Sequence, residues 1–156
     1  MKLKQLALIS LGLMAATASF AQQKAEDLIK TRQGAYKVIA WNVGRIKANV
    51  DGQFNKDEVL KAATAIQALA NAGLGALYAP GTEKGMGYHE TAAKPEIFDP
   101  NNKKIGEVAG NFGKEANELA KVAATGDKAA VKVQLGKLQQ TCKACHDDFR
   151  QEDHHH

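Results

Sequence analysis

The spacing of inward side chains in the first third of the chain is the feature that most limits the fold. Between residues 25 and 50, one stripe of mostly apolar residues recurs in alternating steps of three and four. This is the repeat of one face of a long amphipathic α-helix. Its members are Ile29, Arg32, Tyr36, Ile39, Val43, Ile46 and Val50. Asp51 and Gly52 then supply the turn residues that end the helix.

Three further segments carry a helical repeat, and no segment shows the alternation of a β-strand. They are expected over about 56–79, 102–124 and 127–151, and Asn55 is placed to cap the first of them. Their inward stripes are Val59, Ala63, Ile66, Ala70, Gly73 and Leu77; Ile105, Val108, Phe112, Ala116, Leu119 and Val122; and Val131, Leu135, Leu138, Cys142, Cys145 and Phe149.

Residues 80–101 break the helical pattern. All three prolines of the chain, Pro80, Pro95 and Pro100, stand here together with three glycines. We expect a loop of about twenty residues, which is long for a compact domain. Two short links and one long link between four helices of similar length predict an all-α fold, namely an antiparallel four-helix bundle.

The first 21 residues have the three-part pattern of a secretory signal peptide. Lys2 and Lys4 form a basic region, residues 6–18 form an apolar run, and residues 19–21 offer a cleavage site with small side chains. The apolar run is shorter than the about 20 residues that a membrane span needs. We therefore expect residues 22–153 to form one domain that is soluble and periplasmic after cleavage.

The charge of this predicted mature chain argues against nucleic-acid binding. Loss of Lys2 and Lys4 lowers the net charge from +4 to +2, and charges of both signs are mixed along the chain. A nucleic-acid-binding domain would show a clustered basic face with a far larger excess. No pattern of paired carboxylates, nucleophile and base, or phosphate-binding loop indicates an enzyme. The terminal histidines, residues 154–156, are set aside as a tag remnant or a native tail.

Both cysteines of the chain stand near its end in the pattern Cys-x-x-Cys-His, formed by Cys142, Cys145 and His146. A redox dithiol of this spacing would stand at a helix N-terminus, where the helix dipole lowers a thiol pKa. A zinc site would need a fourth ligand, for which only His89 is available away from the tail. A disulfide is possible, but it would close too small a loop to stabilise the fold much.

Covalent haem attachment is the interpretation that these residues favour. In it, each thiol adds to one haem vinyl group, so the two sulfurs must lie about one helical turn apart. The imidazole that follows can then bind the iron as an axial ligand. Together with a secretory signal, the pattern predicts one haem c held through Cys142 and Cys145, with His146 on the iron. A helical structural or dithiol protein without haem remains the alternative.

Several segments in the same order resemble the cytochrome c′ family, the class II c-type cytochromes. The stretch "AEDLIKTRQGAYKVIAWNVGRI" is similar to the family's first helix, and "YAPGTEKG" to the turn after the second. "AKPEIF" and "CKACHDDFR" are similar to the following stretch and to the haem-binding end. The resemblance covers essentially the whole predicted mature chain. It implies a four-helix bundle with a five-coordinate haem iron that binds nitric oxide and carbon monoxide and can transfer electrons.

The resemblance also implies roles for three further side chains. Tyr36 would occupy the distal side of the haem without binding iron, Arg32 would contact a haem propionate, and Arg150 would lie near the proximal face. Arg32 and Tyr36 share the first inward stripe, and an arginine that faces a core needs a partner. The residues alone leave open that Arg32 is an edge residue whose head reaches water, and that Tyr36 only packs.

The sixth coordination position of the iron separates two functions. Low-spin relatives use a methionine on the first helix, and residues 22–50 contain none. Met86 and His89 lie in the long loop and are expected to face solvent. If either bound the iron, the chain would be a six-coordinate low-spin electron carrier, which is the alternative function. The sequence does not identify a redox partner.

The resemblance further implies a homodimer formed through the first helix. Val38 and Trp41 are apolar residues off the main stripe of that helix, and they are the candidates for this contact. Trp41 and Phe112 are otherwise interpreted as core or interface residues, and Tyr78 as a residue near the haem edge.

Overall fold

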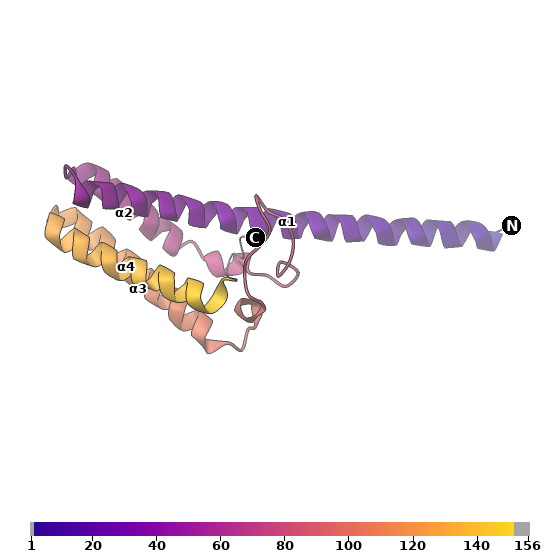
Figure 1. Ribbon diagram of the computed structural model, residues 1–156. Helices are drawn as coiled ribbons and strands as arrows, with labels where there is room; N and C mark the ends of the chain where they lie inside the picture. Colours follow the sequence, from indigo (N-terminus) through magenta and orange to yellow (C-terminus); the bar gives the residue numbers. More distant parts are fainter. Residues whose placement is uncertain (1, 152–156) are drawn as a thin grey trace, which may run out of the picture.

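The computed structural model describes residues 2–151, with their side chains from residue 24 onward. Its elements in chain order are α1 (Lys2–Asp51), α2 (Lys56–Ala70), the 3-10 helices η1 (Leu74–Leu77) and η2 (Pro95–Phe98), α3 (Lys103–Thr125) and α4 (Lys128–Phe149). Within this part of the chain there is no β-strand, and pairing is limited to isolated bridges. Both α1 and α3 pack on α2 and on α4, so the predicted four-helix bundle is confirmed (Figure 1).

The N-terminal end of α1 differs from the prediction. The helix begins at Lys2 instead of near Ala25, and Figure 1 shows its first part projecting beyond the other helices. Residues 2–21 of the predicted signal peptide thus have helical backbone continuous with α1, and their cleavage stays a prediction. Residue 1 and the terminal histidines, 154–156, lie outside the described residues.

Among the helices that the structure describes, none combines the length and the apolar character needed to cross a membrane.

The starts of α3 and α4 follow from local capping. The side chain of Asp127 accepts hydrogen bonds from the backbone N–H groups of Ala129 (2.9 Å) and Ala130 (3.0 Å). The side chain of Asn102 accepts from Lys104 N at 3.1 Å. These side chains satisfy N–H groups that have no partner inside the helix. Both helices begin within one residue of the prediction.

The second helix ends earlier than predicted, at Ala70 instead of near residue 79. The Asn71 side chain donates to Gln67 O at 2.7 Å and to Asn117 Oδ1 of α3 at 3.0 Å, which ties the last turn to the neighbouring helix. Gly73 then has φ 73°, a left-handed conformation that glycine adopts without steric cost. The chain therefore leaves the helix before Tyr78.

The buried core lies in the half of the bundle where α1 ends and α2 begins. Its members come from the antiparallel segments that meet there, and they are Ile39, Ile46, Val50, Val59, Ala62, Ala63, Ile66, Ala116, Leu119, Ala123, Val131, Leu135 and Leu138. We call this half the closed end. The opposite half, made of residues 24–36, 74–98, 103–112 and 141–151, is the site end.

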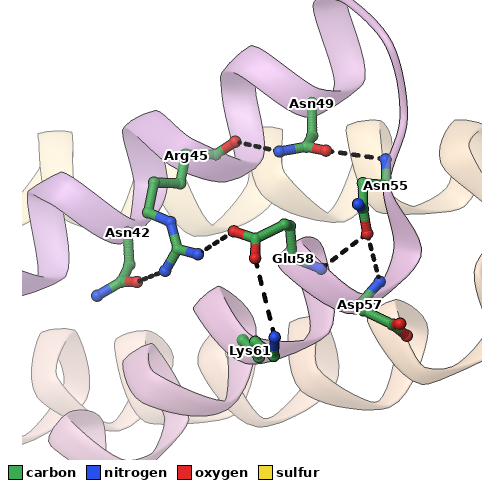
Figure 2. A network of polar contacts seen from close by, with 7 residues as sticks. All are labelled: Asn42, Arg45, Asn49, Asn55, Asp57, Glu58 and Lys61. Carbon is green, nitrogen blue, oxygen red and sulfur yellow. Dashed lines mark hydrogen bonds and ion pairs between the residues drawn. The ribbon is translucent and has the colours of Figure 1, made fainter.

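A polar network fixes α1 against α2 at the closed end (Figure 2). Asn42 is only 1% exposed, and its Oδ1 accepts a hydrogen bond from Arg45 at 3.2 Å. Arg45 also forms an ion pair with Glu58 of α2. Asn49 accepts from Asn55 N at 2.9 Å, and Asn55 in turn caps α2 by accepting from Glu58 N at 3.1 Å. This network couples the register of the two helices to the start of α2.

Candidate functional site

The site end is closed by residues 77–94, which we call the strap. Its last part pairs with the end of α4, because Lys94 N donates to Phe149 O at 2.8 Å and Gln151 N donates to Ala92 O at 2.7 Å. Its first part lies against α1. The strap therefore joins the first and the last helix at the end where the cysteines stand.

Arg32 of α1 is the main anchor of the strap. The side chain is 4% exposed, and its Nη1 donates to Leu77 O (3.1 Å) and Thr82 Oγ1 (2.9 Å). Its Nη2 donates to Thr82 O (2.8 Å) and Thr91 Oγ1 (2.6 Å). Burial lowers the pKa of Arg32, whereas Tyr78, Tyr36 and Glu83 raise it. Four uncharged oxygens thus hold the buried cation in one position.

Gln33 is a second anchor that sequence reasoning missed. Its Oε1 accepts from Tyr88 N at 2.7 Å, and its Nε2 donates to His89 O at 2.9 Å. A Cβ at Gly87 would overlap the Gln33 side chain, so this close approach requires glycine. Gln33 lies off the inward stripe of α1, and nothing in the sequence indicates that its side chain binds the backbone of a distant loop.

Tyr36 and Tyr78 at the site end influence one another's pKa. Tyr36 lies one turn after Arg32 on α1 and is 40% exposed. Burial raises the pKa of Tyr36, a hydrogen bond with Tyr78 lowers it, and the thiols of Cys145 and Cys142 raise it further. Burial also raises the pKa of Tyr78, with further contributions from Tyr36 and Cys145. The structure therefore brings the predicted distal tyrosine into the electrostatic reach of both cysteines.

The end of α4 presents the predicted haem-binding residues. Cys142 and Cys145 are half-buried, and burial raises the pKa of each thiol. His146 is exposed, and its backbone oxygen accepts from Arg150 N at 3.0 Å. Partial loss of its water shell lowers the pKa of the His146 imidazole, and the charge of Arg150 lowers it further. A neutral imidazole is the form that binds a metal.

A disulfide and a zinc site are not seen at the cysteine pair among the described residues. Both thiols are free, so no disulfide joins Cys142 to Cys145. Among the described residues, no group of three or more His, Cys, Asp and Glu side chains could hold a bare metal ion.

The pattern of burial fits a large apolar group at the site end. The inward stripes of α3 and α4 are buried at the closed end and continue at the site end with half-buried side chains, namely Ile105, Val108 and Phe112 of α3 and the two cysteines of α4. A bound planar group would bury the apolar surface that these helices leave exposed, and burial of apolar surface lowers the free energy. Together with two thiols one turn apart and an adjacent imidazole, this arrangement suits a covalently held haem.

Other candidate residues lie on the surface. Met86 is 54% exposed. His89 is also exposed, and its Nδ1 lies 2.9 Å from Glu90 O and 3.3 Å from Gln33 Nε2. Trp41 is 63% and Val38 46% exposed, so Trp41 is not a core residue. Phe112 is half-buried and packs against the core.

Comparisons with known proteins identify the family that this chain resembles. A family model described as Cytochrome C′ matches residues 27–150. The cytochrome c′ of Rhodocyclus tenuis is 63% identical over 131 residues, which make up 83% of this chain and 98% of that protein. A cytochrome c′ described as having an unusual ligand-controlled dimer dissociation has a TM-score of 0.78 and 46% identity, covering 82% of this chain and 97% of that one.

A nitric oxide complex of a mutant cytochrome c prime from Alcaligenes xylosoxidans is similar at a TM-score of 0.72 and 28% identity. It covers 82% of this chain and 97% of that one.

Proposed function

The chain belongs to the cytochrome c′ family, and on this premise we propose that it is a periplasmic gas-binding haem protein with a five-coordinate iron. It binds one haem c covalently, through Cys142 and Cys145. The observation that supports the gas-binding proposal is that Tyr36 of α1 lies within electrostatic reach of both thiols of α4, the helix packed beside it. His146 is the proposed axial ligand, and the side across from it is lined by a phenol.

A phenol on the distal side favours small neutral ligands. Tyr36 has a raised pKa, so it stays protonated at neutral pH and is a poor ligand for iron. Its ring crowds the distal side, so water and anions are excluded while nitric oxide and carbon monoxide can enter. The nitric oxide complex of the relative from Alcaligenes xylosoxidans supports this ligand class.

The surface positions of Met86 and His89 support an open sixth coordination site. Met86 is exposed on the strap, and the backbone oxygen of His89 is bound by Gln33 of α1. The six-coordinate electron carrier is therefore the less favoured function, although a five-coordinate haem can also transfer electrons.

Arg32 and Arg150 keep the roles that the resemblance implies. Arg32 is proposed to lie near a haem propionate. Its four hydrogen bonds to protein oxygens use all four Nη–H donors, so its Nε–H is the donor left for a carboxylate. Arg150 is proposed to lie near the proximal face, since its charge already acts on His146. No residue here is proposed to turn over a substrate, and the protein is proposed to act by binding and electron transfer and not as an enzyme.

Optical absorption of the purified holoprotein tests the proposed function. We expect a broad high-spin spectrum in the oxidised and reduced states, which sharpens when carbon monoxide is added to the reduced protein. A sharp low-spin spectrum that carbon monoxide does not change would contradict the proposal and favour the electron carrier. In that case Met86→Ala and His89→Ala identify the internal ligand, because only loss of the true ligand would restore a high-spin spectrum.

We also propose a homodimer that forms through α1. Val38 and Trp41 are exposed apolar residues on this helix, and the Trp41 ring stacks with the Arg45 guanidinium at 4.8 Å. Aromatic residues and arginine are enriched at protein interfaces. The relative with ligand-controlled dimer dissociation supports an assembly of this kind.

Replacing Trp41 with glutamate is expected to weaken the dimer at least roughly tenfold, because central interface residues contribute most of the binding energy. Sedimentation equilibrium of the holoprotein measures this dissociation constant. Val133→Glu is the matched control, because Val133 of α4 is also 63% exposed. If Val133→Glu dissociates the dimer and Trp41→Glu does not, the interface is on α4 and not on α1.

A further inference from the structure

We propose that Lys94 of the strap is a positioning residue for His146, because it caps the C-terminus of α4, the helix whose last turn carries this histidine. The inference rests on the proposed function, since it concerns the residue that is proposed to bind the iron. It assigns to a side chain far from the Cys-x-x-Cys-His pattern a part in the direction of the axial imidazole.

The end of α4 lacks the turn that ends α3. Gly126 after α3 is left-handed with φ 78°, and its N–H donates to Ala123 O at 3.2 Å. Helices often end in this way, because a left-handed residue directs N–H groups back to the last carbonyls. Arg150 after α4 is instead extended, with φ −109° and ψ 133°. Its N–H donates to His146 O at 3.0 Å, and the carbonyls after His146 need partners from another part of the chain.

Lys94 supplies two of these partners. Its backbone N–H donates to Phe149 O at 2.8 Å, and its Nζ donates to Asp147 O at 3.0 Å. A cation at a helix C-terminus also interacts favourably with the helix dipole. One residue thus binds two of the carbonyl groups that end α4, once through its main chain and once through its charged side chain.

The strap holds Lys94 in place for this contact. Lys94 has φ −71° and ψ 148°, the extended conformation that a residue before proline prefers, and a proline follows it. Gln151 N donates to Ala92 O at 2.7 Å, so main-chain bonds join the strap to α4 on both sides. Arg32 Nη2 donates to Thr91 Oγ1 at 2.6 Å, directly before Ala92. The cap is therefore itself anchored to α1.

His146 stands at the start of the last turn of α4. Helix ends fray, and the carbonyls of the last turn have no partner inside the helix. Asp147 directly follows His146, so the bond from Lys94 to Asp147 O holds the peptide unit next to the proposed iron ligand. Without this bond, the last turn can open and the imidazole can change its direction.

The test compares Lys94→Met and Lys94→Arg with the wild type, all as holoproteins. Methionine keeps the backbone N–H and removes the charged donor, whereas arginine keeps a cation that can bind a carbonyl. Amide hydrogen exchange in residues 147–151 is expected to be roughly fivefold faster in Lys94→Met, as for the loss of one exposed hydrogen bond from a charged group. Lys94→Arg is expected to restore the wild-type rates.

Lys143→Met is the matched control, because Lys143 also binds Asp147. Its Nζ pairs with the Asp147 carboxylate one turn along the same helix, so it does not connect α4 to the strap. An exposed pair of this kind predicts a change in exchange of about twofold at most. Both variants remove one positive charge near His146, so the difference between them isolates the cap from the charge.

A vibrational readout connects the cap to the proposed iron ligand. In a five-coordinate ferrous haem, the iron–histidine stretching band of the resonance Raman spectrum depends on the direction and hydrogen bonding of the imidazole. We expect this band to shift or broaden in Lys94→Met. It is expected to match the wild type in Lys94→Arg and in Lys143→Met.

Equal changes in Lys94→Met and Lys143→Met would overturn the proposal, as would an unshifted iron–histidine band in Lys94→Met. Failure of Lys94→Arg to restore the wild-type values would also overturn it. If Lys94→Met does not fold, Lys94→Gln takes its place, since glutamine is uncharged and shorter than lysine. A wild type without the iron–histidine band would instead reject the proposed five-coordinate iron. The exchange comparison would still decide whether Lys94 caps α4, so the two failures are distinguishable.

Discussion

Replacing Tyr36 with alanine is expected to raise the carbon monoxide affinity of the ferrous protein roughly ten- to hundredfold, if the open position of Tyr36 is populated at about 1–10% in the wild type. In the proposed site the phenol ring of Tyr36 fills the distal side, so a ligand must first displace it. Alanine removes this ring. Equilibrium titration of the reduced holoprotein measures the change.

The gain is expected mainly in the association rate, because the displaced ring is an obstacle to entry. Tyr88→Ala is the control, since Tyr88 is exposed on the strap. An affinity of Tyr36→Ala equal to that of the wild type would remove Tyr36 from the distal role. A loss of affinity would mean that the phenol assists the bound ligand.

The second large effect is expected for Arg32→Met, which keeps an unbranched apolar stem and removes the guanidinium with its donors. Leu77 O, Thr82 O and two threonine hydroxyls lose their charged partner at a buried position. Hydrogen bonds to charged groups and unsatisfied buried acceptors together predict a loss of about 3 kcal/mol in the free energy of unfolding. Denaturant titration of the holoprotein measures this loss.

The matched control is Arg45→Met at the closed end. Arg45 donates a hydrogen bond to Asn42 and forms an ion pair with Glu58 of α2, but its side chain is partly exposed (Figure 2). A partly exposed ion pair predicts a loss of about 1 kcal/mol or less. Amide hydrogen exchange should separate the two variants, because Arg32→Met is expected to speed exchange in residues 77–94 and Arg45→Met is not. Equal losses in both variants would contradict the anchoring role of Arg32.

Most helix boundaries could be predicted because their causes are local. Asp127 and Asn102 cap the residues that directly follow them, so a few letters of sequence contain the signal. The predicted end of α2 was wrong because Gly73 fits the inward stripe of a longer helix. The left-handed turn at Gly73 and the bond from Asn71 to α3 override that stripe, and the second is a tertiary contact.

The site was predictable to the extent that its chemistry is encoded in spacing. Cys142, Cys145 and His146 stand within five residues, and covalent attachment needs that spacing. Gln33 and the hydrogen bonds of Arg32 were not predictable, because their partners are main-chain and hydroxyl groups 45 to 59 residues away. The roles of Arg32, Tyr36 and Arg150 came from resemblance and remain predictions.

The uneven core has a consequence for how such a protein is made. Most of the buried apolar side chains lie at the closed end, whereas both thiols lie half-buried at the other end, on the last helix of the chain. A stability gradient of this kind lets one half fold as a cooperative unit while the other opens at low free-energy cost. We therefore expect the thiols to stay accessible to haem attachment on a chain that already has its topology. The attached haem would then complete the packing of the site end, so attachment and folding would not compete.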